Sequence, residues 1–392
     1  MFRHEAVNTR TGAKAAQRTP SGWLRTHTAI VLLLSLSAVI VMLASSGAPA
    51  QQGGAEMWSA KKQPRSTITM KERADDVSPA QVEADGKRLF RWLEENGGFV
   101  GKIKVTLVDK GKQKIRGLIA TAPLATNETI FRVPRHLFLC SDDVAWPSYQ
   151  SQSTSLFPSP RSDYLLAIRI WEEEQKGEES RWATFLKELP GAEEFATFHP
   201  MMASDALLRP FEALPIVKMI NLRKKKAHKW FQVNSLGNRL RWEDFWLGYV
   251  RYISRSYGIT VKTKTGKRKW MPVAVPVADL GNTAATQDQV NTRWAYDDER
   301  EEFVVTVTMP VAEGQELFES YQISSLKDNS KLAYMFGFTL PGNPTHVEQL
   351  SSEVCRSMLQ LPEEVMGRSR VSSLLYSLAQ EHCVASGETE KA

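Results

Sequence analysis

The chain of 392 residues is 42% hydrophobic and 24% charged, with a formal net charge of +6, which fits one sizeable globular domain with appendages. Its three cysteines, Cys140, Cys355 and Cys383, are scattered, with no CxxC pair and no Cys/His cluster. This pattern argues against a disulfide framework and against a zinc site, so we expect no bound metal.

The N-terminal part contains a long apolar stretch. Residues 28–44 carry no charge and are almost wholly apolar, and roughly 20 such residues span a bilayer core of about 30 Å. This pattern predicts a single-pass membrane protein, with residues 1–50 as a targeting or transmembrane segment. The alternative is a cleaved leader for a plastid or mitochondrion, because Ala48-Pro49-Ala50 is similar to a cleavage site. Positive charge on both sides of the stretch leaves its orientation open.

A polar linker is expected to separate this segment from the folded region. Residues 51–77 are polar and aperiodic. A helix is then predicted to begin after Ser78, an N-cap residue followed by Pro79, and to end before Gly97. Three short strands are expected next, at 102–108, 117–120 and 129–133.

The middle of the chain changes to a helical pattern. Helices are expected at 164–174, 182–189, 206–226 and 242–256, and strands resume at 272–277, 302–309 and 316–321. The sequence therefore predicts an α+β fold. A β-rich domain at 78–342 is split by a helical insert at 141–270 and followed by a short helical C-terminal region at 343–392.

Two basic runs lie within the insert. One is Arg223–Lys226, and the other extends from Lys262 to Lys269. Such runs are usually solvated faces or loops, and the alternative is a docking surface for an acidic protein or a nucleic acid. No aromatic residues alternate with these charges, so the pattern disfavours nucleic acid.

Several motifs occur in an order that resembles one known family. Residues 275–282 read VPVADLGN, residues 313–321 read EGQELFESY, and Asn329 is followed by FGF at 336–338. An opening half is present as GLIA at 117–120 and IFRVP at 130–134. These motifs resemble the two halves of a SET domain of the Rubisco large-subunit methyltransferase-like family, with a helical insert between the halves. The resemblance covers about residues 85–345 and implies a SET fold of short β-sheets.

The resemblance also implies an activity and a set of site residues. Proteins of this family transfer a methyl group from S-adenosylmethionine (AdoMet) to a protein side chain, usually lysine and in one branch histidine. Tyr321 matches the catalytic phenol, and Asp279 and Phe336 match the substrate side, where Asp279 could equally be a structural acid. The cofactor-binding matches are Gly117, Leu118, Arg255, Asn282 and Thr283.

Some positions depart from the family pattern. Thr283 stands where a histidine is usual, Gln322 where a glycine is usual, and Phe336 where a tyrosine is usual; Lys114 and Arg116 are basic where an acid and an apolar residue are common. Two functions therefore stay open: an AdoMet-dependent methyltransferase acting on a protein substrate, or a catalytically weak SET-fold protein serving as a membrane-associated binding module. The chain lacks a GxGxxG segment after a strand, a P-loop and a GxSxG elbow, which argues against other common enzyme classes.

Overall fold

The computed structural model describes residues 78–110, 114–141, 162–262, 266–321, 328–340, 343, 350–366 and 369–384. The expected membrane segment at 28–44 and the linker at 51–77 lie outside these residues. Among the helices that are described, none combines the length and apolar character that a bilayer crossing needs.

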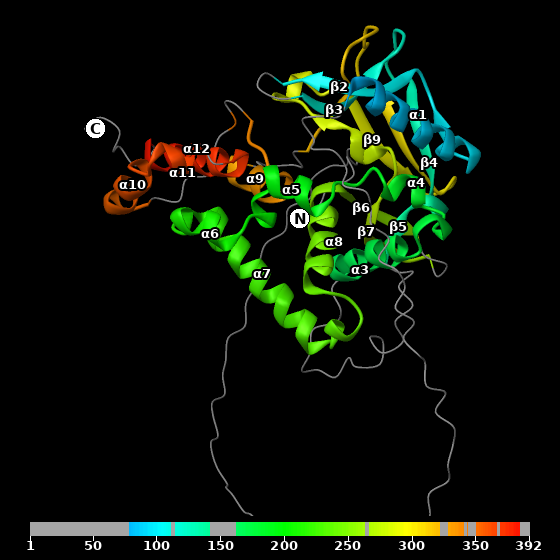
Figure 1. Ribbon diagram of the computed structural model, residues 1–392. Helices are drawn as coiled ribbons and strands as arrows, with labels where there is room; N and C mark the ends of the chain where they lie inside the picture. Colours follow the sequence, from blue (N-terminus) through cyan, green and yellow to red (C-terminus); the bar gives the residue numbers. More distant parts are fainter. Residues whose placement is uncertain are drawn as a thin grey trace, which may run out of the picture. The chain divides into compact units, whose positions relative to one another are not determined.

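The described helices and strands occur in separate runs along the chain and form an α+β structure (Figure 1). The helices are α1 Pro79–Glu95, α3 Ser162–Gln175, α4 Ala183–Leu186, α5 Ala192–Phe198, α6 Asp205–Leu208, α7 Pro215–Val233, α8 Trp242–Arg255, α9 Asn329–Phe336, α10 Ser352–Leu359, α11 Glu363–Met366 and α12 Arg370–Val384. The strands are β1 Phe99–Val100, β2 Ile103–Asp109, β3 Lys114–Ala120, β4 Thr129–Pro134, β5 Leu139–Cys140, β6 Ser256–Lys262, β7 Arg268–Ala274, β8 Asn282–Thr283, β9 Thr292–Asp297, β10 Glu302–Val307 and β11 Phe318–Glu319.

Helix α1 begins and ends where its sequence signals predict. Ser78 accepts a hydrogen bond from the backbone of Gln81 at 3.2 Å, and Pro79 is the first helical residue. After the helix, Gly97 has a φ of 87°, a conformation that glycine adopts without a steric penalty. The buried face of α1, with Leu89 completely inaccessible, packs on β2.

The strands form four small sheets rather than one large one. β1, β4, β10 and β9 form a four-stranded sheet, β5, β7 and β6 form a three-stranded sheet, and β2 pairs with β3. β8 and β11 make a short parallel pair. A continuous apolar core joins the sheets to the helices, as expected for an α+β fold.

The helices between β5 and β6 pack around a cluster of aromatic rings. Tyr164 of α3 lies 4.9 Å from Trp230 of α7 and 5.4 Å from Tyr249 of α8, measured between ring centroids. The single helix expected at 206–226 is wrong: α6 and α7 are separate helices. Pro215 is the reason, because it stands at the first position of α7, where the missing N–H costs nothing.

Five strands escaped the sequence analysis, namely the two-residue strands β1, β5 and β8 and the longer strands β6 and β9. β6 and β7 form an antiparallel hairpin, and β7 begins at Arg268, before the predicted start at residue 272. The basic residues at the hairpin end interrupt the apolar pattern there, although the first residues of β6 are buried. β9 alternates buried and exposed residues and pairs with β10.

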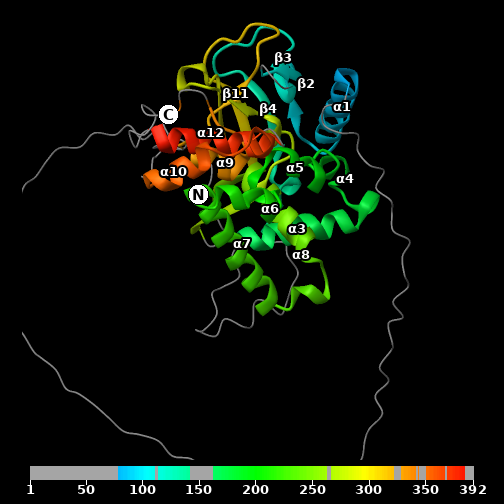
Figure 2. The ribbon, with the colours of Figure 1, turned by 60° about the vertical axis from the view of Figure 1, so that its left-hand side comes forward.

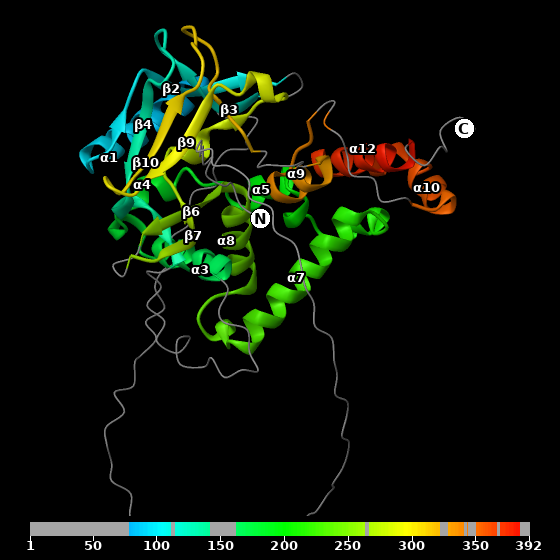
Figure 3. The same cartoon turned by 180° about the vertical axis from the view of Figure 1, so that it is seen from behind.

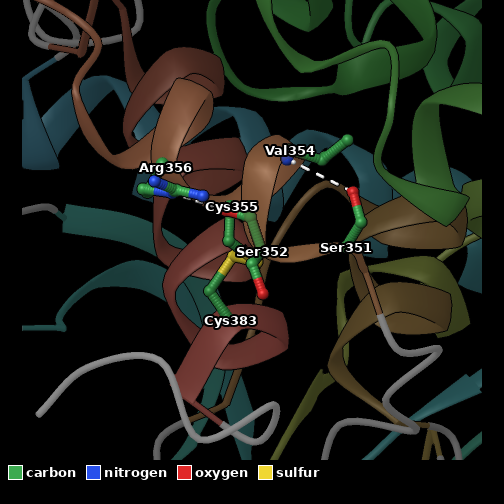
Figure 4. The surroundings of a disulfide bond; sticks show 6 residues. All are labelled: Ser351, Ser352, Val354, Cys355, Arg356 and Cys383. Atoms are coloured by element: carbon green, nitrogen blue, oxygen red, sulfur yellow. Dashed lines mark hydrogen bonds between the residues drawn. A yellow bond between two sulfur atoms is a disulfide. The ribbon is translucent and has the colours of Figure 1, made fainter. Parts of the chain in front are cut away.

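Among the C-terminal helices, α12 packs against α9, α10 and α5 (Figures 1 and 2). Cys355 of α10 and Cys383 of α12 are joined by a disulfide bond, with their Cα atoms 5.6 Å apart (Figure 4). The expectation of scattered thiols is therefore wrong for these two residues. The separation of 28 residues gave no local signal, because the two cysteines meet only when the helices pack.

Candidate functional site

The site is built on the turn between β7 and β8. Val277 has φ 71° and ψ −43°, which is a strained conformation for a β-branched residue. Strain of this kind costs on the order of 1–3 kcal/mol and persists where the surroundings enforce it. The turn leads through Asp279 to β8, where Asn282 lies beside Phe318 in the parallel pairing with β11.

Tyr321 follows β11 and returns to this turn. Its backbone N–H donates to Thr283 Oγ1 at 3.2 Å, and its phenol donates to the carbonyl of Gly281 at 2.7 Å. The ring is 8% exposed and lies 4.5 Å from the ring of Phe336 and 6.1 Å from that of Phe338. The three rings form an aromatic wall beside the turn.

Asn282 connects the turn to β3. Its Nδ2 donates to the carbonyl of Arg116 and to Glu316 Oε1, both at 2.9 Å. A Cβ atom at Gly117 would lie 2.8 Å from this Nδ2, so the close approach of the two elements requires glycine. Glu316 also pairs with Lys110 at 2.6 Å.

Arg255 enters the site from the end of α8. Its Nη1 lies 3.2 Å from Asp279 Oδ2 and donates to the Asp279 carbonyl at 3.3 Å. Asp279 is buried, so its carboxylate is held against the guanidinium in a poorly solvated environment. The Arg255 Nε is also buried, and none of the described residues accepts a hydrogen bond from it.

A second layer of side chains supports the turn. The Tyr257 hydroxyl lies 2.8 Å from both the Ala278 carbonyl and Glu319 Oε1, where one proton can serve only one acceptor at a time. Sequence analysis did not single out Tyr257, Glu319 or Glu316 as site residues. The signal that could have identified Glu319 is a charged residue on the buried side of a short strand.

His199 connects the end of α5 to α9. It is completely buried; its Nδ1 accepts from the backbone of Met201, and its Nε2 lies 3.2 Å from the Met335 carbonyl. Nδ1 is therefore the unprotonated nitrogen and Nε2 donates. Burial lowers the pKa of the imidazole from 6.5 to about 4, so the ring is neutral near neutral pH. Met335, the residue before Phe336, is thereby held by a neutral histidine.

No protein-family model matches the chain. The chloroplastic ribulose-1,5 bisphosphate carboxylase/oxygenase large subunit N-methyltransferase of Pisum sativum is 25% identical over 293 residues, which cover 68% of this chain and 54% of that protein. The chain thus spans about half the length of that curated relative.

Two solved structures are similar to the chain in fold. Rubisco LSMT bound to sinefungin and monomethyllysine gives a TM-score of 0.50 at 22% identity, covering 71% of this chain and 61% of that one. Rubisco LSMT bound to AdoMet gives 0.50 at 18% identity, covering 78% and 76%. The chain has a SET fold similar to that of Rubisco LSMT.

The SET fold brings together the residues that the sequence motifs singled out. Gly117 lies against Asn282. Tyr321 contacts both Thr283 and Phe336, and Arg255 pairs with Asp279. Leu118 is the exception, because its side chain is in the core and only its backbone carbonyl, which accepts from Leu317 at 2.8 Å, lies at the β3 edge.

The residues present fit AdoMet, the cofactor that the SET resemblance implies. A buried Nε on Arg255 suits a carboxylate, and the backbone at Gly117 has no side chain that would fill the adjoining space. Asn282 supplies an amide beside that backbone. Among the described residues there is no cluster of histidine, cysteine or acidic side chains that could hold a metal ion.

Proposed function

We propose that this protein is an AdoMet-dependent protein methyltransferase that methylates lysine side chains. The observation that carries the proposal is the position of Tyr321, whose phenol is fixed on the carbonyl of Gly281, the residue before Asn282, and whose ring packs against Phe336. The relative from pea is named as an N-methyltransferase of the Rubisco large subunit. One structure with the same fold contains AdoMet, and another contains monomethyllysine.

Gly117, Asn282 and Arg255 are the residues proposed to hold AdoMet, with Leu118 contributing backbone and Thr283 closing the edge next to Tyr321. When bound, AdoMet supplies an electrophilic methyl group. Arg255 would bind the cofactor carboxylate through charge-assisted hydrogen bonds. We assign Asp279 to positioning this arginine rather than to touching substrate, because its carboxylate is buried and already faces Nη1.

Tyr321 is proposed to hold the nucleophile. Its proton is donated to Gly281, so toward any other group the phenol oxygen acts as an acceptor. An acceptor at that point can orient an uncharged amine in line with the methyl group and cannot itself protonate it. Phe336 and Phe338 line the same place with apolar surface, which disfavours a charged ammonium and excludes water.

Replacing Tyr321 with phenylalanine tests the proposal. We expect AdoMet affinity to stay within about twofold while methyl transfer to lysine falls by about 100-fold or more, because the lost contact matters in the transition state. Transfer of radiolabelled methyl groups to free lysine, monomethyllysine and the Rubisco large subunit measures turnover, and calorimetry measures binding. Tyr376→Phe is a matched control, because that hydroxyl also donates to a backbone carbonyl but lies in α12.

Two other results would redirect the assignment. Methyl transfer to histidine in place of lysine would move the protein to histidine chemistry, for which Phe336 leaves room. AdoMet binding with no transfer to any acceptor would favour the catalytically weak binding module instead.

We further propose that the protein acts inside an organelle, on a protein substrate located there. The support is the name of the pea relative, which is chloroplastic, together with the alternative that residues 1–50 are a cleaved leader. N-terminal sequencing of the mature protein tests this: a start near residue 51 supports a leader, and retention of residues 28–44 supports the membrane anchor.

A further inference from the structure

The outer face of α7 combines exposed apolar side chains with cations. Met219, Leu222 and Val233 are 37%, 52% and 51% exposed, although they are large hydrophobic residues. At 100° per residue these three positions fall within an arc of about 60° on the helix surface. α7 lies at the edge of the described helices and strands (Figures 1 and 3).

Four lysines lie within this apolar stripe or along one side of it, and the described residues give them no acidic partner. Lys218, Lys225, Lys226 and Lys229 are exposed, and within the described residues none of them forms an ion pair. α7 itself contains no aspartate or glutamate. Its uncompensated positive charge is therefore concentrated on the same side as the apolar stripe.

The other two cations of α7 have a different environment. Arg223 turns inward and donates to the Tyr334 hydroxyl at 3.2 Å, and Lys224 pairs with Asp205 at 3.0 Å. The basic run identified in the sequence thus divides into two parts. Arg223 and Lys224 have partners within the fold, whereas Lys225 and Lys226 form no ion pair with the described residues. Only the second part is available to a partner.

We propose that the outer face of α7, defined by these four lysines and the stripe of Met219, Leu222 and Val233, docks an acidic amphipathic helix of a protein partner. Leucine-like side chains of the partner would cover the stripe, and flanking carboxylates would face the lysines. This pairing removes both the exposed apolar surface and the unbalanced charge.

Other kinds of partner fit this face less well. A membrane-binding helix usually places tryptophan or phenylalanine at the bilayer interface, but Trp230 and Phe231 of α7 are buried. A nucleic acid would contact the lysines through its phosphates but would leave the apolar stripe uncovered.

Fluorescence anisotropy with defined probes tests the docking face. The full-length chain is titrated with a labelled peptide of about 18 residues, built from Glu, Ala and Leu with Leu at helical spacing, and with a scrambled peptide of the same composition. We expect the scrambled peptide to bind about tenfold more weakly. Raising the salt from about 50 to about 300 mM should also weaken binding, because exposed charges are screened.

Paired variants separate the apolar contribution from the electrostatic one. Leu222→Ala with Val233→Ala, and separately Lys225→Glu with Lys226→Glu, should each weaken binding of the amphipathic peptide by about fivefold or more. Lys87→Glu with Arg91→Glu makes the same charge change on exposed positions of α1 and should leave the affinity within about twofold.

Several results would overturn the proposal. These are no binding, equal binding of the scrambled peptide, or unchanged affinity in the α7 variants. Binding of phosphatidylserine vesicles, but not of the peptide, through the same lysines would assign the face to a membrane. Self-association that is lost in the α7 variants would assign it to a second copy of this chain.

Discussion

Gly117 shows how a single residue type sets the geometry of the site. A Cβ atom there would lie 2.5 Å from Val108 Cγ2, 2.8 Å from Asn282 Nδ2 and 2.9 Å from Glu316 Oε1. Gly117→Ala therefore has to displace the amide proposed to contact AdoMet, and we expect affinity for AdoMet to fall by about tenfold or more. Gly191→Ala is the matched control, since its added Cβ would meet nothing within 4 Å. Equal affinity of both variants in a calorimetric titration would remove Gly117 from the cofactor site.

At the scale of elements, the disulfide between α10 and α12 fixes the helices next to α9. Asn329 and Ser330 at the start of α9 contact Glu381 and His382 of α12, which directly precede Cys383. Closing a loop of this length removes chain entropy from the unfolded state worth roughly 3–4 kcal/mol, so reduction should lower the free energy of unfolding by about that amount. Urea unfolding with and without dithiothreitol measures it, with Cys355→Ser expected to be insensitive to reductant and Cys140→Ala to respond as the wild type does. A wild-type midpoint that dithiothreitol leaves unchanged would contradict this role.

The same scale shows what the sequence can predict. Helix α1 follows from its capping residues and apolar spacing, and α8 follows from its helical pattern, which are local signals. Glu319 and His199 escaped notice because their partners lie 62 and 136 residues away along the chain. The meeting of Tyr321 with Phe336 could be expected only through the family motifs, since no periodicity relates these two residues.

At the scale of the whole molecule, burial of His199 makes stability depend on pH. The folded-state pKa is about 4 and the unfolded-state value is near 6.5, so between these values the unfolded chain binds a proton that the folded chain does not. The free energy of unfolding is therefore unaffected by the titration of His199 above about pH 6.5 and falls as the pH drops toward 4. The loss amounts to about 2 kcal/mol at pH 5 relative to pH 8. Denaturant unfolding at the two pH values should show this loss in the wild type and a correspondingly smaller loss in His199→Gln, whose amide does not titrate. The same pH dependence in both proteins would show that His199 is not the group responsible.

The proposed methyltransferase activity requires AdoMet to bind at Arg255 and Asn282. The most direct measurement is a calorimetric titration with AdoMet of the chain from Ser78 onward. We expect this fragment to fold without the N-terminal segment. We expect measurable binding heat and thermal stabilisation, with affinity reduced about tenfold or more in Arg255→Ala and in Asn282→Ala, because each leaves polar cofactor groups unpaired at a cost of about 1–3 kcal/mol. A folded fragment that shows neither heat nor stabilisation with AdoMet would exclude this cofactor site.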